Sequence, residues 1–256
     1  MPLHGLLADF HAETYFGAAI SYGVRNYALY AEVDNAQGAT IQAISEVEYA
    51  GFASAVAVDN YGKYYAHDVN AGTISAYASS SYTEHYGRFT YSFSTAIALI
   101  EDARYFGGTV LENSGDIQAT ALTRDVASFF QGGAGAVAVH QYGKYYAGVT
   151  NSGDIEAYAY ANLGAVTAYG LIQQSKYGSV TYIGNAEGAS IVAEAHSGSL
   201  AGDYNAGFAF ADAVRQFSGS FAQLYNDGLI AASASVEPND RDYMRLLTIL
   251  PRVRSE

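Results

Sequence analysis

An internal repeat constrains the fold of this chain more than any other feature of its sequence. A motif of Asn, a nearby Gly, then Ile and alternating Ala occurs six times, with isoleucines spaced 33 to 43 residues apart and a mean near 38. The asparagines that open the copies are Asn35, Asn70, Asn113, Asn151, Asn185 and Asn226. Constant segments separated by gaps of variable length are typical of strands joined by loops in a repeat fold.

Each repeat contains three strand-like segments. In the fourth copy they are IEAYAYA, AVTAYGLIQ and GSVTYIGN, in which small or apolar residues alternate with others. Period-two alternation predicts strands, and three strands per repeat predict one three-sided turn. We therefore expect an all-β fold, a single-stranded right-handed parallel β-helix (β-solenoid) of about six turns of roughly 38 residues.

A second motif, a small residue, an aliphatic residue, any residue and then an amide or acid, also occurs six times. Its copies are GVRN from Gly23, AVDN from Ala57, ALIE from Ala98, AVHQ from Ala138, GLIQ from Gly170 and AVRQ from Ala213. The regular placement of both motifs supports a repeat of fixed strands.

Alignment of the copies backward from each Asn predicts which side chains point inward. The second residue before the Asn is aliphatic in five copies, with Asp68 as the exception, and the fourth is always small. Both columns have the same parity, as a strand with one buried face requires. Beyond the Asn-Gly turn, a similar set of one large and two small residues at alternate positions predicts that Ile155, Ala157 and Ala159 point inward.

The parity of the remaining segment stays open. Its uniformly small column includes Ala53, Ala55 and Ala57, whereas the opposite parity includes Val58 but also Asp212. Because a carboxylate is costly to bury, Asp212 favours an inward small column, with aliphatic residues such as Val58 partly exposed on the outer side.

Composition fits a narrow interior and excludes several functions. The chain has 45 Ala, and its three prolines lie outside residues 3–237, where backbone N–H groups would be needed for strand pairing. A net charge of −13 argues against binding to nucleic acid or to an anionic membrane surface. The absence of cysteine excludes disulfides and thiolate chemistry, and no apolar run is long enough to insert into a membrane.

The cycle of alternating Ala, a Gly-or-Ala-aliphatic-any-Gln step and the segment NSGDI resembles the passenger repeats of bacterial autotransporter adhesins. The resemblance covers roughly residues 17–236; the first residues lack a secretory signal pattern, and nothing resembles the family's membrane barrel. It implies a cysteine-poor stalk that is extracellular or on a bacterial cell surface. The expected role is a non-enzymatic structural or adhesive module, with no cofactor, that self-assembles head to tail into fibres.

The polar residues of the repeat have two interpretations. Stacked at one corner, the six asparagines would form a ladder of amide hydrogen bonds, with Gly providing a positive φ, in preference to a ligand site. Asp116 and Asp154 occupy equivalent positions and could attract a cation, although a solvated turn is favoured because neighbouring copies have Thr73 and Leu229 there. The six histidines share neither spacing nor column, which argues against a metal site or a catalytic triad.

An aromatic column is the strongest candidate for binding. Tyr30, Tyr65, Tyr146 and Phe221 lie five residues before the asparagines of their repeats and have outward parity, and Tyr64 and Tyr145 accompany them. Stacked tyrosines could simply stabilise the sheet. Alternatively, they could form a flat face for sugar rings or for a second solenoid. The expected partners are therefore copies of the same chain, or an extracellular glycan or host surface.

The two ends of the repeat region are expected to differ. We assign residues 1–16 to an N-terminal cap, residues 17–236 to the β-helix and residues 237–256 to a capping or docking tail. Asn239 is expected to begin a short helix that covers the last turn or docks on an acidic neighbour. The alternatives to a structural role are a carbohydrate-binding module and a polysaccharide-cleaving β-helix enzyme, which would need a cluster of carboxylates in one groove.

Overall fold

A computed structural model describes residues 7–82, 92–103, 105, 107–125, 132–162, 164–176, 179–198 and 207–237. Within these residues the chain forms strands and no helix. The strands are β1 (Leu7–Asn35), β2 (Thr40–Asn70), β3 (Thr73–Tyr82), β4 (Phe93–Ala103), β5 (Gly108–Asn113), β6 (Asp116–Asp125), β7 (Gly132–Gly143), β8 (Tyr146–Asn151), β9 (Asp154–Ala161), β10 (Gly164–Ser175), β11 (Val180–Asn185), β12 (Ser190–Gly198), β13 (Phe208–Phe217), β14 (Phe221–Asn226) and β15 (Leu229–Glu237).

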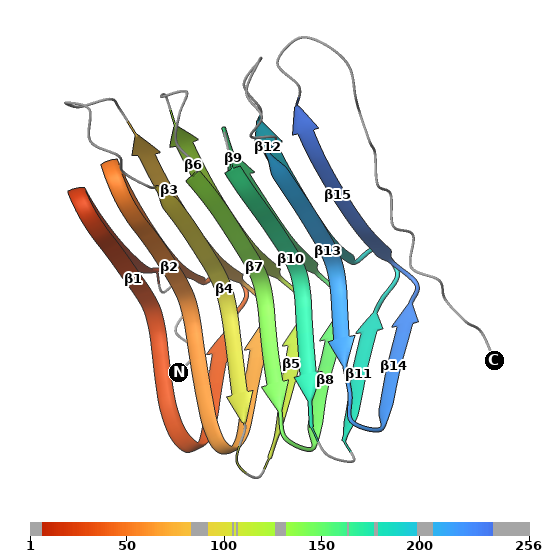
Figure 1. The fold of residues 1–256 in the computed structure, drawn as a ribbon. Coiled ribbons are helices and arrows are strands. Elements are labelled where there is room, and N and C mark those ends of the chain that lie inside the picture. Colours follow the sequence, from red (N-terminus) through yellow and green to blue (C-terminus); the bar gives the residue numbers. More distant parts are fainter. Residues whose placement is uncertain are drawn as a thin grey trace.

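All the strand pairs are parallel, and the strands form three stacks (Figure 1). Stack A contains the beginnings of β1 and β2 and then β3, β6, β9, β12 and β15. Stack B contains the central parts of β1 and β2 and then β4, β7, β10 and β13. Stack C contains the ends of β1 and β2 and then β5, β8, β11 and β14. The all-β, parallel, solenoid-like arrangement predicted from the repeats is therefore confirmed.

Successive repeats lie in register on one another. Asn35 pairs with Asn70, and the same column continues through every strand of stack C. We number the repeats 1 to 6 as residues 7–35, 40–70, 73–113, 116–151, 154–185 and 190–226, and β15 continues stack A beyond them. Each side chain therefore lies beside the residue at the same position in the neighbouring repeat.

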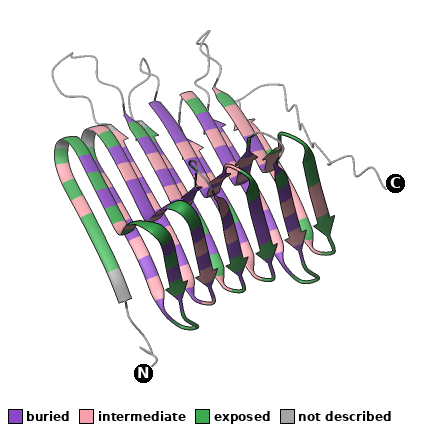
Figure 2. Cartoon of the chain, turned by 90° about the horizontal axis from the view of Figure 1, so that it is seen from below, coloured by how far each residue is buried: buried purple, intermediate pink, exposed green. Residues whose placement is uncertain are grey.

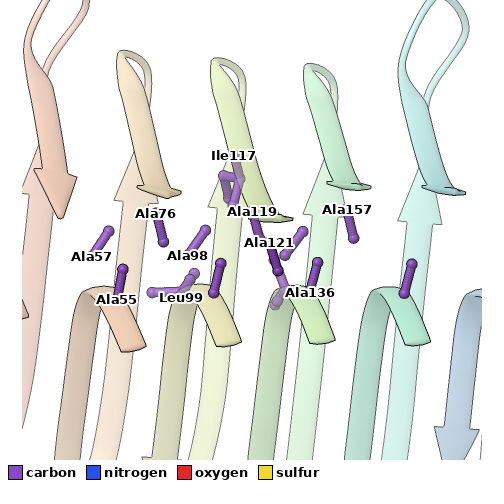
Figure 3. Close-up of a cluster of buried hydrophobic side chains, with 14 of the residues drawn as sticks. Ala55, Ala57, Ala76, Ala98, Leu99, Ile117, Ala119, Ala121, Ala136 and Ala157 are labelled. Carbon is purple, nitrogen blue, oxygen red and sulfur yellow. The ribbon is translucent and has the colours of Figure 1, made fainter. Parts of the chain in front are cut away.

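The interior is filled mostly by small side chains. Ile155, Ala157 and Ala159 are all at most 2% exposed, which confirms the inward parity predicted for this segment. Buried and partly exposed residues alternate along the strands in Figure 2. In Figure 3, alanines of stacks A and B, such as Ala119 and Ala136, point toward one another across the interior. One methyl group per position keeps the opposing sheets close and leaves little room for larger residues.

The middle segment corrects the expected parity. The small column points inward, but Val58, expected on the outer side, is completely buried, as is the preceding Ala57. The residues at the Ala57 position have no pairing partner, whereas the residues on either side pair with the neighbouring repeats. Because the strand bends there, the alternation shifts by one residue and both parities contribute to the interior.

The described residues include only parts of the two proposed end segments. Residues 7–14, assigned to the N-terminal cap, form the first part of β1 and pair in parallel with residues 40–47 of β2. Residues 15 and 16 also belong to β1, and residues 1–6 of the proposed cap lie outside the described residues. Residues 238–256 also lie outside them, including Asn239 and the predicted helix.

Substitution of Ala157 by Leu should test the narrow interior. The larger side chain would overpack the space between the stacks, so we expect the free energy of unfolding to fall by about 1–3 kcal/mol in chemical denaturation. Thr120→Leu, at a half-exposed position of the same stack, should change it by no more than about 0.5 kcal/mol. Equal stabilities for the two variants would contradict the inward assignment of Ala157.

Candidate functional site

The six asparagines form a continuous chain of side-chain hydrogen bonds, which we call the Asn ladder. In the first five repeats the Nδ2 amide donates to the Oδ1 oxygen of the asparagine in the next repeat, at 2.7 or 2.8 Å. Asn151 is completely buried, while Asn226, at the end of the ladder, is exposed. The second amide hydrogen also has an acceptor, as in Asn151 Nδ2, which donates to the carbonyl oxygens of Gly153 and Ser190. These amides are occupied in holding adjacent repeats together.

The glycines after the asparagines have two different roles. Gly38 and Gly188, in the longer turns, have φ angles of 76° and 82°, as expected. In the shorter turns the expectation is wrong, because the glycines have no left-handed φ and are required by close approach of the backbones. A Cβ atom on Gly153, for example, would lie 2.1 Å from the carbonyl oxygen of Gly115 in the preceding repeat.

A second ladder lies where the second motif ends, at the corner between stacks B and C. Its column contains Asn26, Asn60, Glu101, Gln141, Gln173 and Gln216. Gln216 Nε2 donates to Gln173 Oε1 at 3.0 Å, Gln173 Nε2 to Gln141 Oε1 at 2.8 Å, and Gln141 Nε2 to Glu101 Oε2 at 2.6 Å. We call this the Gln ladder. The sequence showed the recurring amide or acid but not this role.

The Gln ladder includes a buried acid. Glu101 is completely buried, and its carboxyl group is in hydrogen-bonding contact with the carboxyl group of Asp68, which is 1% exposed. Burial raises the pKa of Asp68 to about 7. Burial, and then the neighbouring charge of Asp68, raises the pKa of Glu101 well above its usual range. The pair has no open access to solvent and so does not resemble a hydrolytic site.

The predicted aromatic residues lie on the outer surface of stack C, but they do not form one continuous column. Tyr30, Tyr65, Tyr146 and Phe221 are 71%, 36%, 38% and 53% exposed, and Gly108 and Val180 interrupt their column. Their predicted companions Tyr64 and Tyr145 are 36% and 49% exposed. The ring centroids of Tyr30 and Tyr64 lie 5.7 Å apart. The structure thus brings some of the predicted aromatic side chains together as local pairs, such as Tyr30 with Tyr64.

Two tyrosines of stack C lie against glycines two residues later. A Cβ atom on Gly148 would lie 2.7 Å from ring atoms of Tyr146, and one on Gly184 would lie 2.7 Å from the hydroxyl oxygen of Tyr182. The centroid of Tyr182 also lies 5.9 Å from that of Tyr225 in the next repeat. Tyr182 and Tyr225 were not predicted from the sequence, although the Tyr-x-Gly spacing is a visible signal for Tyr182. We call Tyr65, Tyr146, Tyr182, Phe221 and Tyr225 the aromatic surface.

The acidic and histidine residues show no metal-binding arrangement in the part of the chain that the structure describes. No group of three or more His, Asp or Glu side chains there could hold a metal ion. Asp116 and Asp154 are neighbours in stack A, and Asp154 Oδ1 accepts a hydrogen bond of 2.7 Å from the Ser190 hydroxyl. Burial, followed by the charge of nearby carboxylates, raises the pKa of Glu156 beside them.

Comparison of the chain with protein-family models, curated proteins and solved structures finds no match. Among the described residues there is no helix with the length and hydropathy needed to span a membrane. The repeats, the two ladders and the surface of the stacks are therefore the features of this chain that bear on its function.

Removal of one rung should weaken the Asn ladder. In Asn151→Ala, the Nδ2 group of Asn113 loses an acceptor and the Oδ1 atom of Asn185 loses a donor. Unpaired buried groups cost about 1–3 kcal/mol, so we expect a loss of unfolding free energy of that size. Gln118→Ala, on the exposed side of stack A, should cost less than about 0.5 kcal/mol. If the two variants unfold alike, the ladder contributes no stability.

Proposed function

We propose that this chain is a right-handed parallel β-helix that acts as a non-enzymatic structural and adhesive module and self-assembles head to tail. The in-register parallel pairing and the filling of each column by one kind of residue support the β-helix. Right-handedness follows from the strong preference of parallel crossover connections for that hand. The repeat resemblance to autotransporter adhesins supports a place outside the cell or on a bacterial surface.

The observation that carries the assembly proposal is that the described strands leave both ends of the stacks open. The strand β1 pairs only with β2, and at the other end β13, β14 and β15 each pair on one side only. Unpaired strand edges present rows of N–H and C=O groups that can pair with another chain. Because all strands are parallel, a second copy in the same orientation offers the matching edge.

The last repeat also exposes part of the interior. An open pocket there is lined by Val214, Leu224 and Ile230, which are only half-buried, whereas Leu171, Ile183 and Ile191 at the same positions of interior strands are completely buried. Covering such apolar surface is favourable by about 25 cal/mol per Å². A second copy that continued the stacks would bury these side chains as the interior repeats already do.

The ladders have a direction that suits head-to-tail joining. Among the described residues, no side chain continues the Asn ladder beyond the Nδ2 donor of Asn226 or the Oδ1 acceptor of Asn35. The Gln ladder runs in the opposite direction and ends on the Oε1 acceptor of Gln216. The last repeat therefore carries the Asn226 donor and the Gln216 acceptor, and the Asn35 acceptor lies at the opposite end, where a neighbour of the same polarity would meet the Asn226 donor.

A carbohydrate-binding module is the second candidate, and the aromatic surface favours it. Tyr146 lies against Gly148 and leaves ring surface exposed on the outside of stack C. Exposed tyrosines offer apolar area for stacking on a sugar ring and a hydroxyl for a polar contact. Glycan binding on the side of the stack would be compatible with assembly through the ends.

A charge at the open end should prevent assembly. In Ile230→Lys, an ammonium group would replace an apolar side chain that assembly buries, so we expect the mass measured by light scattering to decrease relative to the wild type. Ser233→Lys adds the same charge at an exposed position of the same strand and should leave the mass unchanged. A wild-type chain that stays monomeric at every concentration, or an equal mass for all three proteins, contradicts assembly through this end.

A further inference from the structure

Two departures from the repeat pattern meet inside the molecule. Asp68 occupies a column that is aliphatic in the other five repeats, and Glu101 occupies a column that holds an amide in the other five. Asp68 belongs to repeat 2 and Glu101 to repeat 3, and their carboxyl groups are in hydrogen-bonding contact. If only one of these two acids were present, its carboxyl group would be buried with no second carboxyl group beside it. The two exceptions therefore form one unit.

The hydrogen bonds around the pair leave one oxygen of each carboxyl group without a donor. Asp68 Oδ1 accepts from Asn60 Nδ2 at 3.0 Å, and Glu101 Oε2 accepts from Gln141 Nε2 at 2.6 Å. The other carboxyl oxygens, Asp68 Oδ2 and Glu101 Oε1, have no donor, and neither has Asn60 Oδ1. Two carboxylates contain only acceptors, whereas one proton converts an oxygen of the pair into a donor. A proton between the two carboxyl groups supplies a donor for the oxygens of the pair, while Asn60 Oδ1 remains without one.

The residues packed against the pair do not neutralise it. On the adjacent strands, the residues paired with Asp68 and Glu101 are the uncharged Val33 in β1, Asn60 in β2, Leu111 in β5 and Gln141 in β7. The nearby titratable groups are Asp102 in β4, and Glu32, Tyr65, His67, Glu112 and Tyr146 on the outer side of stack C. His67 Nε2 lies 3.6 Å from Glu112 Oε1, which is beyond hydrogen-bonding distance. No lysine or arginine of the described residues pairs with either acid.

We propose that Asp68 and Glu101 share one buried proton, which makes the contact between repeats 2 and 3 a pH-sensitive lock. With the proton bound, an O–H donor of one carboxyl group satisfies an acceptor of the other. When the proton leaves to solvent, two carboxylates remain next to each other in the interior. Like charges in such an environment repel strongly, so the contact between the two repeats is weakened.

The direction of the pH effect follows from burial. Both acids have a raised pKa in the folded chain, so the folded state retains the proton over a pH range in which the unfolded chain has released it. The stabilisation is complete below about pH 4, near the ordinary pKa of these acids. It is lost as the pH rises through about 7, the raised pKa of Asp68. The contact between repeats 2 and 3 is therefore stable at acidic pH and weakened toward alkaline pH.

Glu101→Gln tests the proposal, because the amide keeps the shape of the acid and provides permanent N–H donors. Wild type and variant would be unfolded in urea at pH 5, 6, 7 and 8 and followed by circular dichroism. We expect the unfolding equilibrium constant of the wild type to rise relative to that of the variant, by up to about tenfold per pH unit. At pH 8 the variant should be the more stable protein.

Asp34→Asn, which neutralises an exposed carboxylate of stack C, is the control and should retain the wild-type pH profile. Parallel profiles for wild type and Glu101→Gln would overturn the proposal. So would a wild-type loss at pH 8 that sodium or calcium ions reverse, because the pair would then bind a cation. If Glu101→Gln does not fold, Asp68→Leu combined with Glu101→Gln restores both column patterns. A flat relative profile for that double variant supports the lock, and a wild-type slope refutes it.

Discussion

Parallel, in-register pairing of equivalent residues is the constraint on which the rest of the structure depends. Each side chain meets the residue at its own position in the neighbouring repeat, so a buried residue must be compatible with its own copy. Asparagine and glutamine meet this requirement because an amide is both donor and acceptor. A column of acids does not, since carboxylates repel one another. The two amide ladders and the scarcity of buried charge follow from the same geometry.

The same constraint explains where the pattern breaks. Glu101 interrupts the Gln ladder, and the exception lies in contact with Asp68, the exception in another column. At the ends, where the described chain has no further repeat, residues such as Ile230 are more exposed than the equivalent Ile191 of an interior strand. Among the described strands, those of the interior repeats are therefore paired on both sides, whereas those at the two ends are paired on one side only.

The sequence predicted the features that depend on a fixed column. The stacked asparagines, the inward Ile155 and Ala157 and the outward tyrosines all follow from period-two alternation and from the spacing of the repeats. The bend at Ala57 was not predictable in this way, because parity was read along one continuous strand and the unpaired residue shifts it. The Gln ladder was missed because its column varies between Asn, Glu and Gln, which hides a common role.

Contacts between residues that come close only in the folded chain could not be predicted from the sequence either. The collision that excludes a side chain at Gly153 arises from the carbonyl oxygen of Gly115, 38 residues earlier. The contact between Tyr146 and Gly148 depends on the orientation of a ring, which the residue pattern does not specify. Asp68 and Glu101 belong to two different columns of the repeat. Only the folded chain brings these columns together, at the corner between stacks B and C.

Disulfide trapping measures the register most directly, because the chain contains no cysteine. Gln118 and Glu156 are paired neighbours on the outer side of stack A, whereas Tyr158 lies two residues further along. Cysteines at positions 118 and 156 should form a bond under mild oxidation, as followed by thiol labelling and mass spectrometry, since paired strands bring them within disulfide range. Cysteines at 118 and 158 should remain reduced. Faster trapping of the 118 and 158 pair would contradict the in-register stacking.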